Sequence, residues 1–188
     1  MRVIAGKYRS RPLRSLRGMD LRPTADRLRE TLFNVLTAAN PTALEGTVWL
    51  DLFAGTGAVG IEALSRGASQ VYFVESSVPA AQLVRKNLQS LGVEFGFQVL
   101  RQDVIRTLQK LEAEPVMVDF VFLDPPYRME EVYQRTLGFL GESRLLSSNG
   151  IVMAEHQKKF DLGEIFGSLQ RYRKLEQGDA GLSFYRKM

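Results

Sequence analysis

Residues 49–60 read Trp-Leu-Asp-Leu-Phe-Ala-Gly-Thr-Gly-Ala-Val-Gly, and this stretch decides the fold. The run from Val48 to Phe53 is apolar except for Asp51, as expected for a parallel strand that is covered on both faces. A helical pattern begins at Ile61, and the glycines before it allow backbone to approach a ligand closely. The stretch therefore predicts a strand, a glycine loop and a helix, with a ligand site at the loop.

The sequence of the glycine loop is compatible with more than one interpretation. Gly55, Gly57 and Gly60 fit the dinucleotide fingerprint G-x-G-x-x-G, and Glu75 follows Gly55 by 20 residues, where a ribose-binding acid is expected. Asp51 argues against a nicotinamide dinucleotide, because a carboxylate at the strand end repels a pyrophosphate and attracts a cationic ligand. A tight turn without a ligand is a third interpretation of the same residues.

Composition limits the classes of protein. A chain of 188 residues with 45% hydrophobic content predicts one domain with a substantial core. The absence of Cys excludes disulfides and thiolate metal sites, and a single His argues against an imidazole metal site. No apolar run approaches the roughly 18 residues of a membrane span, and the N-terminus lacks the apolar core of a signal peptide. We expect a cytoplasmic protein with neither a metal nor a membrane partner.

Positive charge is concentrated at the N-terminus. Residues 1–30 carry nine basic and three acidic side chains, a balance of +6, whereas the whole chain has a net charge of +4, which leaves −2 for the rest. This asymmetry predicts a polyanionic partner such as nucleic acid, although a solvated basic tail has the same composition. The candidate nucleic-acid-binding residues are Arg2, Lys7, Arg9, Arg11, Arg14 and Arg22. We expect a basic arm and helix over residues 1–40 and the main domain over 41–188.

Strands and helices alternate through the main domain, which predicts βαβ units and a parallel sheet. A loop with Gly178 and Gly181 separates the last two strands and favours an antiparallel hairpin. Apolar and basic residues also alternate in residues 3–16, which predicts an irregular hairpin or arm that buries little by itself. The expected strands are 48–53, 70–75, 97–100, 118–123, 151–155, 172–175 and 182–185. The expected helices cover 24–39, 61–66, 79–91, 104–113 and 130–140.

Four acids lie at the ends of the first four predicted strands: Asp51, Glu75, Asp103 and Asp124. Ligands of open α/β sheets bind beyond the carboxyl ends of the strands, so these side chains are candidates for one site. S-adenosylmethionine offers a partner to three of them. Glu75 suits the ribose hydroxyls, Asp103 the adenine amino group and Asp51 the cationic methionine end.

The sequence Asp124-Pro125-Pro126-Tyr127 is the most specific motif. The prolines fix the backbone and remove donors, which leaves the Asp124 carboxylate and the Pro125 carbonyl as acceptors beside an aromatic ring. Two acceptors bind both hydrogens of an exocyclic amino group and draw the nitrogen lone pair out of conjugation, while Tyr127 stacks on the base. The motif predicts methyl transfer to a planar amine, and a rigid turn after a buried strand is the alternative.

The chain resembles the RsmD family of class I S-adenosylmethionine-dependent methyltransferases, which modify the exocyclic N2 of a guanine in small-subunit ribosomal RNA. The resemblance rests on residues 2–9, 22–24, 29–34, 51–57, 74–75, 124–127 and 155–156. It implies a Rossmann-like, mostly parallel seven-stranded sheet that ends in an antiparallel hairpin, with the basic arm added. Ser10 and Ser77 depart from the family pattern, which usually has Gly at the first position and Asn or Asp at the second.

The resemblance also implies roles for residues. The cofactor would be S-adenosyl-L-methionine, and the partner would be 16S rRNA in the small ribosomal subunit or its assembly intermediate, bound by a monomer. The implied cofactor contacts are Asp51, Phe53, Gly55, Thr56, Gly57, Glu75, Ser76, Asp103 and Val104. The implied catalytic residues are Asp124, Pro125, Pro126 and Tyr127.

Several functions stay open from the sequence. The same chemistry serves adenine N6 or a protein glutamine amide, and a silent RNA-binding assembly factor or a nicotinamide-dependent dehydrogenase would keep the fold. His156 is the single histidine, and we expect a neighbour to satisfy its ring at a strand end.

Overall fold

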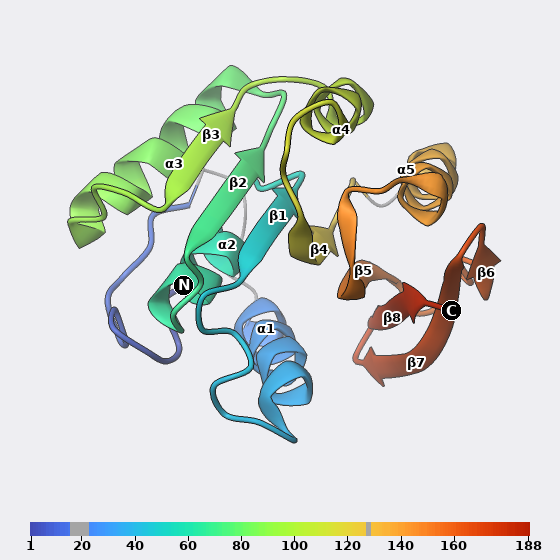
Figure 1. Ribbon diagram of the computed structural model, residues 1–188. Helices are drawn as coiled ribbons and strands as arrows, with labels where there is room; N and C mark the ends of the chain where they lie inside the picture. The colour runs from blue at the N-terminus through green and yellow to red at the C-terminus, as the bar shows by residue number, and fades with distance from the viewer. Residues whose placement is uncertain (16–22, 127–128) are drawn as a thin grey trace.

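The apolar runs of the sequence form the strands of one sheet. The strands are β1 (Val48–Leu52), β2 (Gln70–Val74), β3 (Phe97–Leu100), β4 (Val118–Leu123), β5 (Leu146–Gln157), β6 (Ile165–Phe166), β7 (Leu169–Gln177) and β8 (Ala180–Lys187). The computed structural model describes residues 1–15, 23–126 and 129–188, and in these it gives an eight-stranded sheet of order β3-β2-β1-β4-β5-β8-β7-β6 (Figure 1). Strands β1 to β5 are parallel, whereas β8 pairs antiparallel with both β5 and β7.

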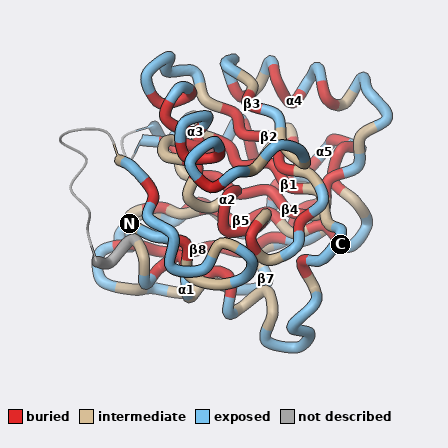
Figure 2. Tube along the Cα trace, turned by 90° about the vertical axis from the view of Figure 1, so that its left-hand side faces the viewer, coloured by how far each residue is buried: buried red, intermediate tan, exposed pale blue. Residues whose placement is uncertain are grey.

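Helices cover both faces of the sheet. They are α1 (Pro23–Thr37), α2 (Ala58–Ser65), α3 (Val78–Leu91), α4 (Val104–Glu112) and α5 (Glu130–Glu142). The period-2 alternation of β1 explains the two layers, since Trp49 packs with the core of α1, α2 and α3, and Leu50 with the core of α4 and α5. Both side chains are fully buried. Figure 2 shows the buried residues gathered in the central strands and on the inner sides of the helices.

The expected parallel sheet that closes in an antiparallel hairpin is confirmed, with one strand more than the seven expected. The additional strand, β6, has two residues, which is too short for alternation to reveal. Strand β5 begins at Leu146 instead of residue 151. Leu146 already pairs with Val118 of β4, and the polar residues 147–149 form an irregularity before regular pairing resumes at Ile151. Such polar residues favour a loop from sequence alone.

Residues 1–13 form the expected irregular hairpin, but it is docked on the body of the protein. Arg2 and Pro12 form a bridge, while Val3 and Leu13, exposed by 1% and 6%, belong to the main core. The buried carboxylate of Glu62 in α2 accepts the backbone N–H groups of Ile4 at 2.7 Å and Ala5 at 2.9 Å. The hairpin therefore buries its apolar residues against partners far along the chain, and not by itself.

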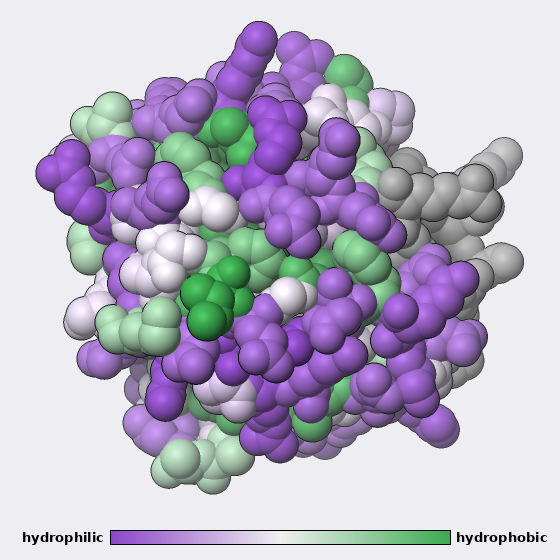
Figure 3. Space-filling model, turned by 90° about the vertical axis from the view of Figure 1, so that its right-hand side faces the viewer, coloured by the Kyte–Doolittle hydropathy of each residue, from purple (hydrophilic) through white to green (hydrophobic). Residues whose placement is uncertain are grey.

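The side of the molecule that carries α5 and the C-terminal strands is largely hydrophilic, with hydrophobic atoms gathered near the middle of the face (Figure 3). Among the described residues, no helix is both long and apolar enough to cross a membrane.

Replacing Glu62 tests how the hairpin is held. Glu62→Ala removes the acceptor of two backbone N–H groups and of Arg66 Nε, so we expect the free energy of unfolding in urea to fall by roughly 2–4 kcal/mol. Glu94 is exposed, so Glu94→Ala is the matched control and should shift the free energy of unfolding by less than about 0.5 kcal/mol. Equal stability of the two variants would contradict this role for Glu62.

Candidate active site

A cavity of about 880 Å³ lies at the carboxyl ends of the parallel strands. The chain proceeds from β1 to β2 and β3 on one side and from β4 to β5 on the other, so the strand order reverses between β1 and β4. Such a switch point is where open α/β sheets bind ligands, and the volume is in the range of small-molecule pockets. Segments that follow β1, β2, β3 and β4 line the cavity, together with β5 and α1.

The loop after β1 carries the backbone strain of the site. Phe53 has a φ of 61°, in the left-handed region that non-glycine residues rarely adopt, and Gly55 and Gly57 have φ values of 56° and 76°. Phe53 and Gly55 line the cavity, as does Thr56, whereas Gly57 does not. A Cβ at Gly57 would lie 3.1 Å from Val84, so this glycine serves the close packing of the loop on α3.

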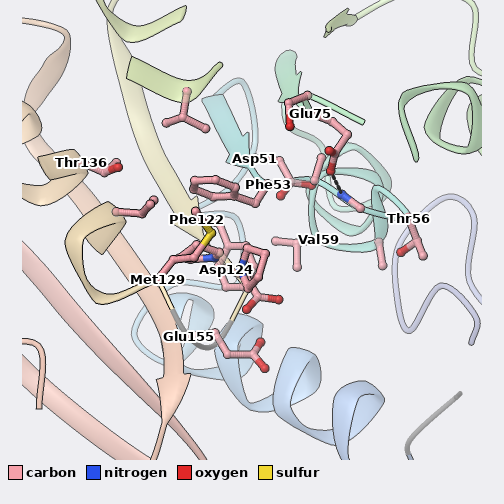
Figure 4. Close-up of a pocket in the computed structure, with 18 of the residues that line it drawn as sticks. Asp51, Phe53, Thr56, Val59, Glu75, Phe122, Asp124, Met129, Thr136 and Glu155 are labelled. Carbon is pink, nitrogen blue, oxygen red and sulfur yellow. Dashed lines mark hydrogen bonds between the residues drawn. The ribbon is translucent and has the colours of Figure 1, made fainter. Parts of the chain in front are cut away.

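Glu75 is held beside the glycine loop. Its Oε2 accepts from the N–H of Gly55 at 3.0 Å, and its Oε1 accepts from the N–H of Ser77 at 2.8 Å (Figure 4). Each carboxylate oxygen has a second lone pair, so both can accept one more donor from the cavity. The predicted Ser76 lines the same wall.

Asp103 and Val104 lie at the start of α4 and line the cavity. The Oδ1 of Asp103 accepts from the N–H of Arg106 at 3.1 Å, which is the usual N-cap bond. Asp103 is exposed and Val104 is buried, so an acceptor lies next to an apolar wall. That pairing suits a flat heterocycle with an amino group.

Three carboxyl groups share the deeper part of the cavity. Asp51 is 2% exposed and accepts from the N–H of Gly60 at 2.9 Å, and burial raises its pKa to about 7 against the lowering effect of that bond. Burial, and then the charge of Glu155, raises the pKa of Asp124 well above its usual range. Figure 4 shows Asp124 and Glu155 together on the side of the cavity opposite Glu75.

Glu155 was missed as a site residue, although the strand-end rule that selected the other acids applies to it. It ends the predicted strand 151–155 and lies in β5, where it lines the cavity. The structure also brings the predicted Pro125 and Pro126 to this wall. The predicted Tyr127 lies outside the described residues.

Arg29 of α1 is a second cavity residue, and in the sequence it stands out only as one of the basic side chains of residues 1–30. It is 6% exposed, and its guanidinium donates to the carbonyl of Arg2 at 2.5 Å and to Asp26 at 3.1 Å. Its Nε is buried without a hydrogen-bond partner in the described part of the chain, and burial lowers its pKa. An arginine between Leu28 and Leu32 on an apolar helix face is the signal that points to it.

Among the described residues, none of the predicted basic residues lines the cavity. Arg2, Lys7, Arg9, Arg11 and Arg14 are exposed on the docked hairpin, and Arg22 lies outside the described residues. The segment reaches the cavity through Met1 and Ser15, which line it.

Buried Asn87 of α3 joins the basic hairpin to the glycine loop. Its side chain accepts from the N–H of Arg14 at 2.9 Å and donates to the carbonyl groups of Arg14 and Thr56. The hairpin and the loop are therefore fixed to the same point.

His156 is buried and satisfied by neighbours, as expected. Its Nδ1 lies 2.9 Å from the carbonyl of Gln157, which can only accept, so Nδ1 carries the hydrogen and Nε2 accepts from the hydroxyl of Ser183 at 2.9 Å. Burial lowers its pKa, which keeps the ring neutral. A Cβ at Gly181 would lie 2.6 Å from the ring, so His156 packs against the opposite strand. Among the described residues, no group of three or more His, Cys, Asp or Glu could hold a metal.

Comparisons with known proteins extend this picture. The family model described as "Conserved hypothetical protein 95" matches residues 1–186. Ribosomal RNA small subunit methyltransferase D of Haemophilus influenzae is 37% identical over 159 residues, covering 84% of this chain and 79% of that protein. The solved structure of yhhF from Escherichia coli has a TM-score of 0.82 and 30% identity, covering 100% of this chain and 97% of that one. The 16S rRNA N2 methyltransferase RsmC of Thermus thermophilus, solved with AdoMet and guanosine, shares the fold, with a TM-score of 0.72 and 22% identity over 92% of this chain and 45% of that one.

The hydrogen-bond acceptors that line the cavity fit S-adenosylmethionine. Glu75 has acceptor capacity for two hydroxyls, Asp103 lies beside an apolar wall, and Asp51 supplies a carboxyl group for a cation. Fold, site and the relatives of 30% identity or more together define a class I S-adenosylmethionine-dependent methyltransferase. Within that class, the chain belongs to the RsmD family.

The pKa of Asp51 makes stability depend on pH. A raised carboxyl pKa means that the native state binds the proton more tightly than the unfolded chain. The stabilisation that this tighter proton binding gives the native state is complete below pH 4 and is lost as the pH rises through about 7. Asp51→Asn cannot titrate and still accepts from Gly60. We expect the ligand-free variant to gain stability relative to the parent between pH 4 and 8, on the order of 4 kcal/mol, in urea unfolding.

Asp119→Asn, which removes a carboxylate outside the cavity, is the control for this pH series. A stability difference between Asp51→Asn and the parent that stays constant from pH 4 to 8 would show that Asp51 is not a titrating buried acid.

Proposed function

We propose that this protein transfers a methyl group from S-adenosylmethionine to the exocyclic N2 amino group of a guanine in 16S ribosomal RNA. The observation that carries the proposal is the position of Asp124-Pro125-Pro126 at the end of β4, across the cavity from Glu75 and the glycine loop. Two relatives support it by their names. One is the small subunit methyltransferase D of H. influenzae, and the other is RsmC, which was solved with guanosine.

The cofactor would extend from Asp103 past Glu75 to Asp51. Glu75 would accept both ribose hydroxyls with the lone pairs that its backbone bonds leave, and Asp103 would accept from the adenine amino group beside Val104. Asp51 would face the methionine end, where an ammonium group lowers the pKa of a buried carboxyl and favours its charged form. When bound, the cofactor supplies an electrophilic methyl group on a sulfonium.

The motif at the end of β4 would hold the amine. The Asp124 carboxyl and the Pro125 carbonyl would accept its two hydrogens and turn the nitrogen lone pair toward the methyl group. With the cofactor bound, its methyl group would pass from sulfur to the amine nitrogen, and the nitrogen would then lose one proton. The raised pKa of Asp124 suits it to receive that proton, while Tyr127 would stack on the base.

The docked hairpin would bind the RNA backbone. Its exposed arginines and Lys7 belong to the same N-terminal segment as Met1 and Ser15, which line the cavity, so phosphates bound by this segment would guide a flipped base toward Asp124. Arg22, from the sequence, completes the proposed set. We expect the protein to act in the cytoplasm as a monomer on the small subunit or its assembly intermediate.

Identification of the methylated nucleoside tests the proposal. The protein, labelled S-adenosylmethionine and either small subunits, free ribosomal RNA or DNA are incubated, and the nucleosides are analysed by mass. We expect N2-methylguanosine in ribosomal RNA. Asp124→Ala should lower the rate by about 100-fold or more, since it removes one acceptor of the amine, and Asp124→Asn should keep part of it.

The control variant for this assay is Glu94→Ala, whose exposed side chain lies outside the cavity and should not affect the rate. Methyl label on adenine, on DNA or on protein would contradict the proposed substrate. A parent rate in Asp124→Ala would contradict the proposed role of the motif.

Charge removal on the hairpin tests the RNA-binding surface without exposing its core. Changing Arg2, Lys7 and Arg9 to Gln leaves Val3, Leu13 and the backbone bonds to Glu62 in place. We expect weaker RNA binding, and a slope of log affinity against log salt that is shallower by about 0.7 for each phosphate that the variant no longer neutralises. Cofactor affinity should not change.

A control with the same change of charge at exposed positions of the body replaces Lys110, Arg144 and Lys159 by Gln. If both triple variants have the same salt slope, the hairpin makes no special contribution to RNA binding.

A further inference from the structure

Glu155 and Asp124 are neighbours because of the sheet register. In the parallel pairing of β4 with β5, Leu123 lies opposite Ala154, so the next residues along the two strands are Asp124 and Glu155. Paired residues of neighbouring strands project to the same face. Both side chains line the cavity, and Figure 4 shows their carboxyl groups directed to the same region. A ligand group that contacts one of them is therefore within reach of the other.

Two carboxyl groups this close favour a particular kind of ligand edge. Like charges in a buried site repel, and the charge of Glu155 is one cause of the raised pKa of Asp124. A ligand relieves this repulsion if it places hydrogen-bond donors against both carboxyl groups. An edge that alternates a donor with an acceptor would instead set an acceptor lone pair against a carboxylate, which costs free energy.

The nucleobases differ on this point. The Watson–Crick edge of guanine presents two adjacent donors, N1–H and the N2 amino group. Adenine has an acceptor, N1, beside its N6 amino group, and cytosine has an acceptor, N3, beside its N4 amino group. Enzymes that act on flipped bases read this edge by hydrogen bonds. Guanine is therefore the amino-bearing base that matches a pair of acids.

We propose that Glu155 determines specificity for guanine by accepting the hydrogen of guanine N1 while Asp124 holds the N2 amino group. This inference rests on the proposed function and adds a residue that selects the base. It also explains why an acid rather than an amide suits this position of β5, since a carboxylate has acceptors but no donor. Adenine would be rejected because its N1 faces the carboxylate of Glu155.

A base analogue isolates the contact to N1. 2-Aminopurine keeps the exocyclic amino group at position 2 but has an acceptor at N1. Small subunits are reconstituted with 16S rRNA in which a synthetic fragment carries guanine or 2-aminopurine at the mapped target position. We expect the parent to methylate guanine at least about 100-fold faster, because an unpaired polar group at a hydrogen-bonding site has a large effect on discrimination.

Glu155→Gln places a hydrogen-bond donor where the parent has only acceptors, so its amide can donate to N1 of 2-aminopurine. We expect the ratio of the methylation rates of guanine and 2-aminopurine to be about 10-fold or more smaller in this variant than in the parent. Asp124→Asn should slow both substrates alike, since both have the amino group that Asp124 holds, and Glu94→Gln should leave the preference of the parent unchanged. An unchanged preference in Glu155→Gln would overturn the inference.

The two proposals fail in different ways. If the parent forms no N2-methylguanosine, the proposed function is wrong whatever Glu155 does. If the parent forms it and Glu155→Gln slows both bases equally, only the role of Glu155 is wrong. Thermal unfolding and calorimetric titration with S-adenosylmethionine show whether the variant is folded. If it is not, Glu155→Asp, with its carboxylate withdrawn by one methylene, must lower the preference for guanine for the inference to stand.

Discussion

The hydrogen bond from the backbone of Gly60 to the buried carboxyl of Asp51 is the contact on which the site depends. It joins the end of β1 to the first turns of α2 and so fixes the loop between them, including the left-handed turn at Phe53. Gly60 is required there, because a Cβ would lie 2.4 Å from the ring of Phe73 in β2. The same short connection thus sets the position of α2 on the sheet and the shape of the cofactor wall.

Three carboxyl groups determine which ligand charges suit this cavity. Asp51, Asp124 and Glu155 come from three adjacent strands and face one cavity, where burial makes the charged forms of Asp51 and Asp124 costly. A cation or a row of N–H donors lowers that cost, whereas a phosphate or a carboxylate raises it. A cation or a row of N–H donors therefore suits this cavity better than an anion does. Glu75, which the backbone of the glycine loop holds in place, would bind neutral hydroxyls under the proposed function.

The sequence predicts the centre of the molecule better than its edges. Strands β3 and β4 have the expected bounds, because buried parallel strands are continuous apolar runs between clear breaks. The start of β5 and the short β6 were missed, since edge and irregular segments contain polar residues that a loop would also contain. Strand-end acids were found as a group, yet Glu155 was read as part of a strand. The burial of Val3 and Leu13 was not predictable, because it depends on Glu62 and Asn87, which are distant in sequence.

The docked hairpin has a consequence for how the protein is made. Its partners lie far downstream: Glu62 receives bonds from Ile4 and Ala5 at separations of 58 and 57 residues, and Asn87 binds Arg14 across 73. A chain that emerges from its N-terminus first therefore exposes its most basic segment throughout the synthesis of α1, β1 and α2, and the segment can settle only after α3 has followed. These early residues are among the last to reach their native contacts, and until then their positive charge is available to any polyanion nearby.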